Sequence, residues 1–292
     1  MSKALVSYLQ VVVVLVVAAV VAVACSQGSV VTAGWPVFAL CMAFAFIVQW
    51  VVFVPSYLAR TEHFFDLTGS ATYISVVVLA LVLNPVDSRG AIVAALVGVW
   101  ALRLGSFLFQ RVRAAGSDGR FDKLKHNFPA FLLTWTLQGL WVSLSLAAGL
   151  VVLTSSKQVP LDVWAALGGI VWLLGFALEI VADRQKSAFK ADPANADTFI
   201  RTGLWAWSRH PNYLGEILLW FGIFIIAIPV MSGWQWAAAI SPIFVYCLLS
   251  FISGIPLLEA RGRRKWGNDP AYQEYLATTP KLLLSSPKGA SS

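Results

Sequence analysis

The chain has 292 residues, of which 59% are hydrophobic and 12% are charged, and its formal net charge is +7. A soluble domain carries roughly 25% charged residues, so this composition excludes an ordinary soluble enzyme and favours a membrane protein. The basic residues stand in short loops between apolar segments, where membrane orientation accounts for them, and this placement argues against a nucleic-acid partner.

Apolar segments follow one another along the chain, and several have the ~20 residues that a helix needs to cross a bilayer. The first is long for the apolar part of a signal peptide and is interpreted as a span. We therefore predict an all-α fold, a polytopic transmembrane helical bundle of about seven to eight spans without a Rossmann domain. One integral-membrane domain is expected over 1–292, with N-terminal spans in 1–60, a main region in 61–284 and a flexible tail in 285–292. The expected spans cover 5–25, 36–57, 68–84, 91–110, 128–153, 162–182, 213–230 and 235–257.

Lysine and arginine are unequally distributed over the loops that join these spans. Of the 21 such residues, only Arg89 and Lys157 fall in loops on one side, and Arg103 lies inside a span. The positive-inside rule assigns the opposite side, with both termini, to the cytosol. We expect a protein of a bacterial inner membrane whose cofactor loops and C-terminus are cytosolic.

The three cysteines, Cys25, Cys41 and Cys247, all lie in apolar segments. They form no CxxC pattern and no cluster with histidine, so neither a disulfide framework nor a metal site is expected. We interpret them as small buried side chains.

Polar and ionisable residues recur in or beside the spans at spacings that place them on single helix faces. An α-helix advances about 100° per residue, so offsets of 4 and 11 return to nearly the same face. Such residues are costly in a membrane and usually mark function, although they could also pair among themselves to fix helix packing. The stripes are Glu62, Asp66 and Tyr73; Trp100, Arg103, Phe107 and Gln110; Glu179, Asp183, Lys186 and Lys190; and Asn212, Glu216 and Trp220.

Three segments place many arginines on the expected cytosolic side: 111–123, 201–216 and 261–266. Contact with anionic lipids would explain their charge. It would not explain the Asn, Tyr, His and Glu residues that are interleaved in 201–216, so we favour a bound polyanionic cofactor, because arginine suits bidentate phosphate binding. The expected cofactor-binding residues in these segments are Arg111, Arg113, Arg201, Arg209, His210, Tyr213, Arg261 and Arg264, and Lys190 is expected to join them.

Several motifs resemble the steroid 5-alpha-reductase family. They are IRTGLW at 200–205, SRHPNYLGE at 208–216 and the ending WGNDPAYQEY at 266–275. The segments LRLG at 102–105 and GSDGRF at 116–121 are also similar to bacterial members. Isoprenylcysteine carboxyl methyltransferases carry a similar Arg-His-Pro-x-Tyr motif and a similar ending.

The resemblance implies an NADPH-dependent membrane reductase of steroid-like enones, in which loops and C-terminal helices hold the cofactor. The sequence agrees in having no GxGxxG motif after a strand. By matching family positions, the resemblance implies cofactor contacts for Asp183, Asn212 and Glu216, and Arg103 matches a family arginine. The chain departs from the family at the substrate-binding Gln-Glu of the second span, which does not align, and at Trp100, which replaces a tyrosine.

The expected reaction reduces the C=C bond of a 3-oxo-Δ4 steroid or a similar lipid enone. A hydride reaches the β-carbon, and a hydrogen-bond donor must meet the negative charge that develops on the carbonyl oxygen. Helical phase makes Tyr73 the expected donor, supported by a Glu62 that burial keeps protonated, and these two are the expected catalytic residues. Asp66, Trp100 and Gln138 are the expected substrate-binding residues.

The expected partners are the hydrophobic enone and membrane lipids, with no metal, no nucleic acid and no obligate protein partner. The main alternative is methyl transfer from S-adenosylmethionine to a lipid or lipidated carboxylate, but that cofactor has no phosphate for the arginines. A transporter would show broken spans in matched halves, and none is evident. A structural alternative for Glu62 pairs it with Arg60 or His63.

Overall fold

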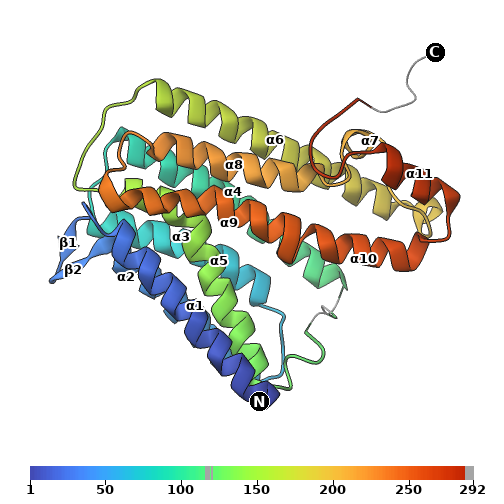
Figure 1. The fold of residues 1–292 in the computed structure, drawn as a ribbon, viewed down its shortest axis with the longest axis horizontal. Helices are drawn as coiled ribbons and strands as arrows, with labels where there is room; N and C mark the ends of the chain where they lie inside the picture. The colour runs from blue at the N-terminus through green and yellow to red at the C-terminus, as the bar shows by residue number, and fades with distance from the viewer. Residues whose placement is uncertain (116–118, 120, 287–292) are drawn as a thin grey trace. The chain divides into compact units, whose positions relative to one another are not determined.

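The computed structural model describes residues 1–115, 119 and 121–286, without the side chains of 111–115. Helices account for almost all of the regular structure in these ranges (Figure 1), and the prediction of an all-α fold is confirmed. The elements are α1 (Lys3–Cys25), β1 (Val31–Thr32), β2 (Trp35–Pro36), α2 (Val37–Leu58), α3 (Phe65–Leu83), α4 (Ser88–Ala115), α5 (Phe128–Thr154), α6 (Val163–Ala191), η1 (Pro193–Asn195), α7 (Leu204–Trp207), α8 (Pro211–Ala227), η2 (Gly233–Ala239), α9 (Ile240–Cys247), η3 (Leu248–Ile252), α10 (Ile255–Trp266) and α11 (Pro270–Thr278).

Within the described ranges, seven helical segments are long and apolar enough to cross a membrane. Backbone N–H and C=O groups in a bilayer must form hydrogen bonds within their own segment, as they do in a helix. Seven apolar helical segments of this length in the described ranges identify the chain as an integral membrane protein. Six of the seven are single helices, α1 to α6. The seventh, Gly233–Trp266, joins η2, α9, η3 and α10. The expected span 213–230 corresponds to α8, a shorter apolar helix of 17 residues.

The chain divides into two compact units, of which the first comprises Met1–Ala166 and Ile223–Ser241. Its central helix is α5, which contacts α1, α2, α3 and α4 (Figure 1). A helix that is apolar all round is a buried helix, and almost every residue of α5 from Gln138 onward is buried. At Gly139 the α2 helix comes close, since a Cβ there would lie 2.8 Å from the ring of Phe46.

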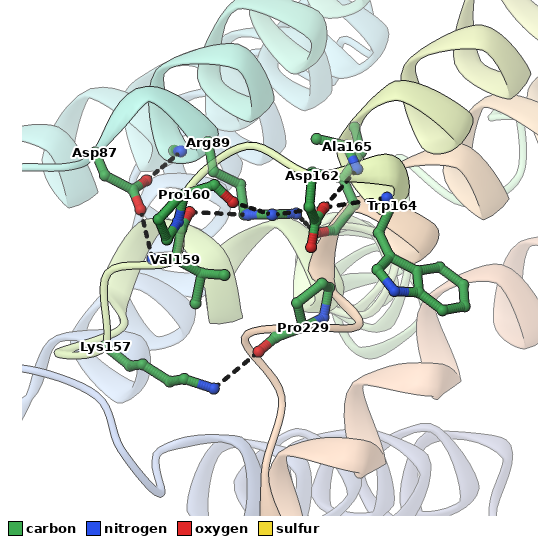
Figure 2. A network of polar contacts seen from close by, with 11 residues as sticks. Asp87, Arg89, Lys157, Val159, Pro160, Asp162, Trp164, Ala165 and Pro229 are labelled. Carbon is green, nitrogen blue, oxygen red and sulfur yellow. Dashed lines mark hydrogen bonds and ion pairs between the residues drawn. The ribbon is translucent and has the colours of Figure 1, made fainter.

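At one end of this first unit, a buried arginine joins three segments (Figure 2). The side chain of Arg89 is fully buried, and its guanidinium donates to the carbonyl oxygens of Val159 at 3.3 Å and Pro160 at 2.7 Å. It also donates to the carbonyl oxygen of Ile226 over 2.8 Å and pairs with the Asp162 carboxylate at 2.8 Å. The start of α4, the loop before α6 and the end of α8 are thereby held together.

The second unit comprises Leu167–Gly222 and Pro242–Ser292. Here α6 and α8 cross with their backbones in contact. A Cβ on Gly215 would lie 2.6 Å from the carbonyl oxygen of Gly175, and one on Gly222 would lie 2.6 Å from that of Gly168. On both helices the two glycines are seven residues apart, which is nearly two turns, so they share one face.

The C-terminal part of the second unit contains a broken helix. The α9 helix passes into a π-helical turn, η3, and α10 begins as a separate helix after Gly254. Pro256 in the first turn of α10 has no N–H to continue the earlier hydrogen bonds. The α10 helix carries Glu259, and its last turn carries three basic residues, Arg263, Arg264 and Lys265.

Candidate functional site

Two polar stripes of the second unit meet where α6 crosses α8. A Cβ on Gly215 would lie 2.7 Å from the backbone nitrogen of Glu179, so no side chain separates the helices at this point. Nearby, the Asn212 side-chain amide donates to the carboxylate of Asp183 over 3.2 Å. Glu216 is half-buried one turn further along α8. The structure therefore pairs two of the residues that were expected to bind a cofactor, Asp183 and Asn212.

Polar atoms that lack hydrogen-bond partners gather at the start of α8. Nε of Arg209, both ring nitrogens of His210 and Oδ1 of Asn212 are buried, and no described residue forms a hydrogen bond with them. A buried group left in this state costs about 1–3 kcal/mol. Such a concentration of donors and acceptors is typical of a place that binds water or a ligand.

An acidic residue of α10 that sequence reasoning missed completes this cluster. Glu259 Oε1 lies 2.9 Å from Nη1 of Arg209, and both side chains are largely buried. The same oxygen lies 3.7 Å from Nε2 of His210, which is beyond hydrogen-bond distance. The signal that could have revealed Glu259 is its isolation, since it is the one carboxylate in a strongly basic segment, 257–266.

His210 is held as a neutral ring. Burial, and after it the positive charges of Lys186, Arg209 and Lys281, lower the pKa of His210 to about 3. The ring is stacked on Tyr213, with centroids 5.7 Å apart and planes 10° from parallel. At neutral pH the His210 ring therefore offers one N–H donor and one acceptor nitrogen. Because the ring is uncharged, its contact with the Glu259 carboxylate is not an ion pair.

The protein should become less stable as the pH falls from about 7.5 to about 5, because His210 stays neutral while folded and gains a proton on unfolding. The unfolded state binds the additional proton below its usual pKa of 6.5, and the folded state does so only near 3. Thermal unfolding in mild detergent across this range measures the effect. His210→Gln should flatten the slope, and the exposed His126 provides the control His126→Gln. An unchanged slope in His210→Gln would contradict the neutral buried ring.

Hydrogen bonds and a cation–π contact hold two aromatic residues, Trp205 of α7 and Tyr275 of α11, in the unit that contains Arg209 and His210. The Lys186 ammonium lies 4.5 Å from the centroid of the Trp205 ring, and the indole N–H of Trp205 donates to the carbonyl oxygen of Ala182 over 3.0 Å. The hydroxyl of Tyr275 donates to the carbonyl oxygen of Trp205 over 2.7 Å, and burial raises the pKa of Tyr275. These contacts fix α7 and α11 beside α6.

The C-terminal segment 280–285 runs beside the Trp207–Arg209 backbone. The amide of Arg209 donates to the carbonyl oxygen of Pro280 over 2.9 Å, and Ser208 Oγ donates to that of Leu282 over 2.8 Å. The amide of Ser285 in turn donates to the carbonyl oxygen of Trp207 over 3.0 Å. The segment thus positions the residues that precede α8.

The remaining cations expected at the cofactor are more dispersed. Arg201 lies 5.9 Å from the centroid of the Phe199 ring. Lys190, Arg261 and Arg264 are exposed. Side chains at Arg111 and Arg113, on α4, fall outside the described part of the chain.

The first unit places Glu62 differently from the helical-phase prediction. Arg60 has a left-handed backbone with φ of 51°, and α3 begins only at Phe65, so Glu62 lies in the preceding connection and not on the helix face of Asp66 and Tyr73. Its carboxylate accepts a hydrogen bond from the Lys125 ammonium over 3.0 Å. A cation at this distance favours the ionised carboxylate, contrary to the expected protonated form.

Tyr73 lies in the interior of the first unit. Its ring is fully buried and packs nearly perpendicular to the rings of Trp100 and Trp141, with centroids 5.0 and 5.2 Å away. Its hydroxyl forms a hydrogen bond with Ser145 Oγ. The α3 helix runs unbroken from Phe65 to Leu83, so it includes Tyr73 and leaves Glu62 outside.

The other expected substrate residues lie around the same helices. The Gln138 amide donates to the carbonyl oxygen of Phe65 over 2.8 Å, and its Oε1 is buried with no hydrogen bond to the described chain. Asp66 is half-buried in the first turn of α3. Arg103, expected at the cofactor, has its guanidinium carbon 5.5 Å from the centroid of the Phe107 ring.

Comparison with protein families finds one matching family model, described as "Protein of unknown function (DUF1295)", over residues 52–279. The match covers most of the chain and includes the polar residues of both units. No curated protein and no solved structure matches the chain.

Proposed function

Since the chain belongs to the DUF1295 family, whose description assigns no activity, we propose that it is an NADPH-dependent membrane reductase acting on the C=C bond of a 3-oxo-Δ4 steroid or similar lipid enone. The observation that carries the proposal is the set of buried donors and acceptors on Arg209, His210 and Asn212 that no described residue satisfies. The resemblance of the same segment to the steroid 5-alpha-reductase family supports it.

The residues of the second unit fit the chemistry of this cofactor. A carboxamide can donate to Asn212 Oδ1 and accept from a neutral His210, and Glu216 can accept from its NH₂ group. Arg209 Nε remains available as a donor. Exposed cations on the same unit, Arg201 and Arg261 among them, suit phosphates. NADPH, when bound, supplies the hydride, and the chain supplies orientation and electrostatics.

On the substrate side, Tyr73 is the proposed donor to the enone carbonyl oxygen. The surrounding Trp100 and Trp141 rings exclude water, and this strengthens a hydrogen bond to a developing negative charge. In the ground state the hydroxyl is paired with Ser145, which holds it in place until a substrate oxygen replaces that partner. The lysine beside Glu62 makes that carboxylate a poor acid, so the protonation role falls to Tyr73.

We also propose the orientation in the membrane. Of the lysines and arginines in loops, only Arg89 and Lys157 stand on one side of the membrane. The positive-inside rule therefore assigns Arg209, His210, Asn212 and α10, on the other side, to the cytosolic face of a bacterial inner membrane. The cofactor would then be available from the cytosol, and the lipid substrate from the bilayer.

Isothermal titration of the detergent-solubilised protein tests the proposal. NADPH should bind, and NADH should bind at least about tenfold more weakly, because one cation would lose the 2′-phosphate. Asn212→Ala should weaken NADPH binding by about tenfold through loss of a buried hydrogen bond. The exposed Asn268 of the same unit gives the control Asn268→Ala. Equal affinity for both dinucleotides, or binding of S-adenosylmethionine in their place, contradicts the reductase and favours a methyltransferase.

Tyr73→Phe should reduce turnover of a 3-oxo-Δ4 steroid by about a hundredfold, because a donor to the developing oxyanion is removed. NADPH affinity should remain at the wild-type value, and the loss of the bond to Ser145 should lower stability by only about 1 kcal/mol. Steroid reduction under saturating NADPH is the measurement. Tyr246, which is exposed on α9, supplies the control Tyr246→Phe. Wild-type turnover in Tyr73→Phe would rule out Tyr73 as the donor.

A further inference from the structure

A π-helical turn, η3, interrupts the last long apolar segment of the described chain. The amide of Ser253 donates to the carbonyl oxygen of Leu248, five residues earlier, over 2.9 Å. The next residue, Gly254, precedes the separate helix α10. Single π-helical turns are rare, and they occur frequently at functional sites. The polar side chains of this turn are therefore candidates for contact with a ligand.

Ser250, in the middle of this turn, has a buried hydroxyl. Hydroxyl side chains in membrane helices commonly donate to the carbonyl oxygen four residues earlier, as Thr134, Thr136 and Thr154 do over 2.8 to 2.9 Å. Ser250 is 5% exposed, and its Oγ forms no hydrogen bond with any described residue. A buried hydroxyl in this state has a desolvation cost that a bound ligand would remove.

Ser250 lies on the face of the broken segment that meets α8. An offset of four residues is close to one full turn, in an α-helix and in the wider π-helix alike, so Ser250 and Gly254 share a face. A Cβ on Gly254 would lie 3.0 Å from Cε2 of Tyr213, and the Tyr213 ring is stacked on His210. The face that carries Ser250 therefore borders the candidate site at His210.

The level of Ser250 follows from the course of α8 and α9, which lie side by side in Figure 1. Gly254 contacts the start of α8, whereas 242–246 line one groove with 217–221, so the two segments run antiparallel. Ser250 lies between these two levels, about 6 Å along the helix from Gly254. It therefore lies beside the turn of α8 that contains the half-buried Glu216.

We propose that Ser250 is a further ligand-binding residue of the second unit, which contacts the same bound molecule as His210 and Asn212. A serine hydroxyl can both donate and accept a hydrogen bond, and this matches a carboxamide, which offers a donor and an acceptor. Ser250 therefore binds the carboxamide end of NADPH, at the level of Glu216. The identity of this ligand rests on the proposed function, whereas the availability of the Ser250 hydroxyl does not.

The first measurement needs no ligand. Thermal unfolding of the full-length protein in mild detergent should give Ser250→Ala the same midpoint as the wild type or a higher one. Alanine removes a buried hydroxyl that has no partner in the fold, and such a replacement is neutral or stabilising. A midpoint below that of the wild type would overturn the proposal, because the hydroxyl would then have its partner within the chain.

The second measurement is isothermal titration of the same protein with NADPH. Ser250→Ala should bind NADPH about tenfold more weakly than the wild type, the loss expected for one buried hydrogen bond. Ser250→Thr keeps the hydroxyl and should stay within about threefold of the wild type. The matched control is Ser253→Ala, three residues along, because Ser253 is exposed, and this variant should bind as the wild type does.

The outcomes separate this inference from the proposed function. If the wild type binds NADPH and Ser250→Ala binds it equally well, Ser250 is no ligand residue, and the reductase proposal stands. If the wild type binds S-adenosylmethionine and no NADPH, the reductase proposal fails, and the same variants titrated with that ligand decide the role of Ser250. A wild-type protein that binds neither ligand overturns both.

Discussion

Replacing Arg89 by methionine should lower the free energy of unfolding by about 3 kcal/mol, the lower end of the cost of removing one member of a buried ion pair. The guanidinium is fully buried and serves three carbonyl oxygens and one carboxylate (Figure 2). Methionine fills similar space and donates nothing. The cost stays at the lower end because the Asp162 side chain is 35% exposed and can be hydrated.

Unfolding in a graded denaturing detergent, followed by circular dichroism, measures this change. Arg89→Lys should fall between wild type and Arg89→Met, because an ammonium keeps the charge but lacks the planar fork that reaches several acceptors. Arg184 is exposed on α6, so Arg184→Met controls for loss of a surface cation and should stay within about 0.5 kcal/mol of wild type. Equal stabilities of the two methionine variants would show that the Arg89 network contributes little.

Gly215→Ala should lower the free energy of unfolding by about 1–3 kcal/mol. It should also abolish the proposed NADPH binding at Arg209, His210 and Asn212. The added Cβ would lie 2.6 Å from the carbonyl oxygen of Gly175 and 2.7 Å from the amide nitrogen of Glu179. Both are backbone atoms, which cannot rotate away, so the α6 and α8 helices must separate. Their separation would break the 3.2 Å bond between Asn212 and Asp183.

Gly169→Ala on α6 is the matched control, because a Cβ there meets nothing within 4 Å. In that variant only the intrinsic helix preference changes, and alanine is favoured over glycine by about 1 kcal/mol. The two alanine substitutions should therefore shift the unfolding transition in opposite directions. If Gly215→Ala is as stable as Gly169→Ala and binds NADPH equally well, the close crossing of α6 and α8 is not required for either property.

Helical periodicity was reliable within helices and unreliable at their ends. Asp183 and Asn212 belong to stripes in or at the ends of α6 and α8, and the structure joins them. Glu62 and Tyr73 were placed on one face by the same reasoning, but the left-handed φ of 51° at Arg60 delays the start of α3. One left-handed residue before a helix is enough to take neighbouring residues off the helix, so the helical spacing no longer applies to them. Composition does not reveal such a backbone angle.

Hydropathy alone predicted the long apolar helices α1 to α6 and the apolar α8, since the polar backbone of a segment inside a bilayer must form its hydrogen bonds internally. Polar spacings also predicted the helix faces of Asp183 and Asn212, which the structure brings into contact. Only the tertiary structure decided the partners of individual charges: Glu62 with Lys125, 63 residues away, Arg89 with the carbonyl oxygen of Ile226, 137 residues away, and Arg209 with Glu259. These pairings depend on how helices cross and where loops turn, and such long-range geometry is a property of the packed chain and not of any local pattern.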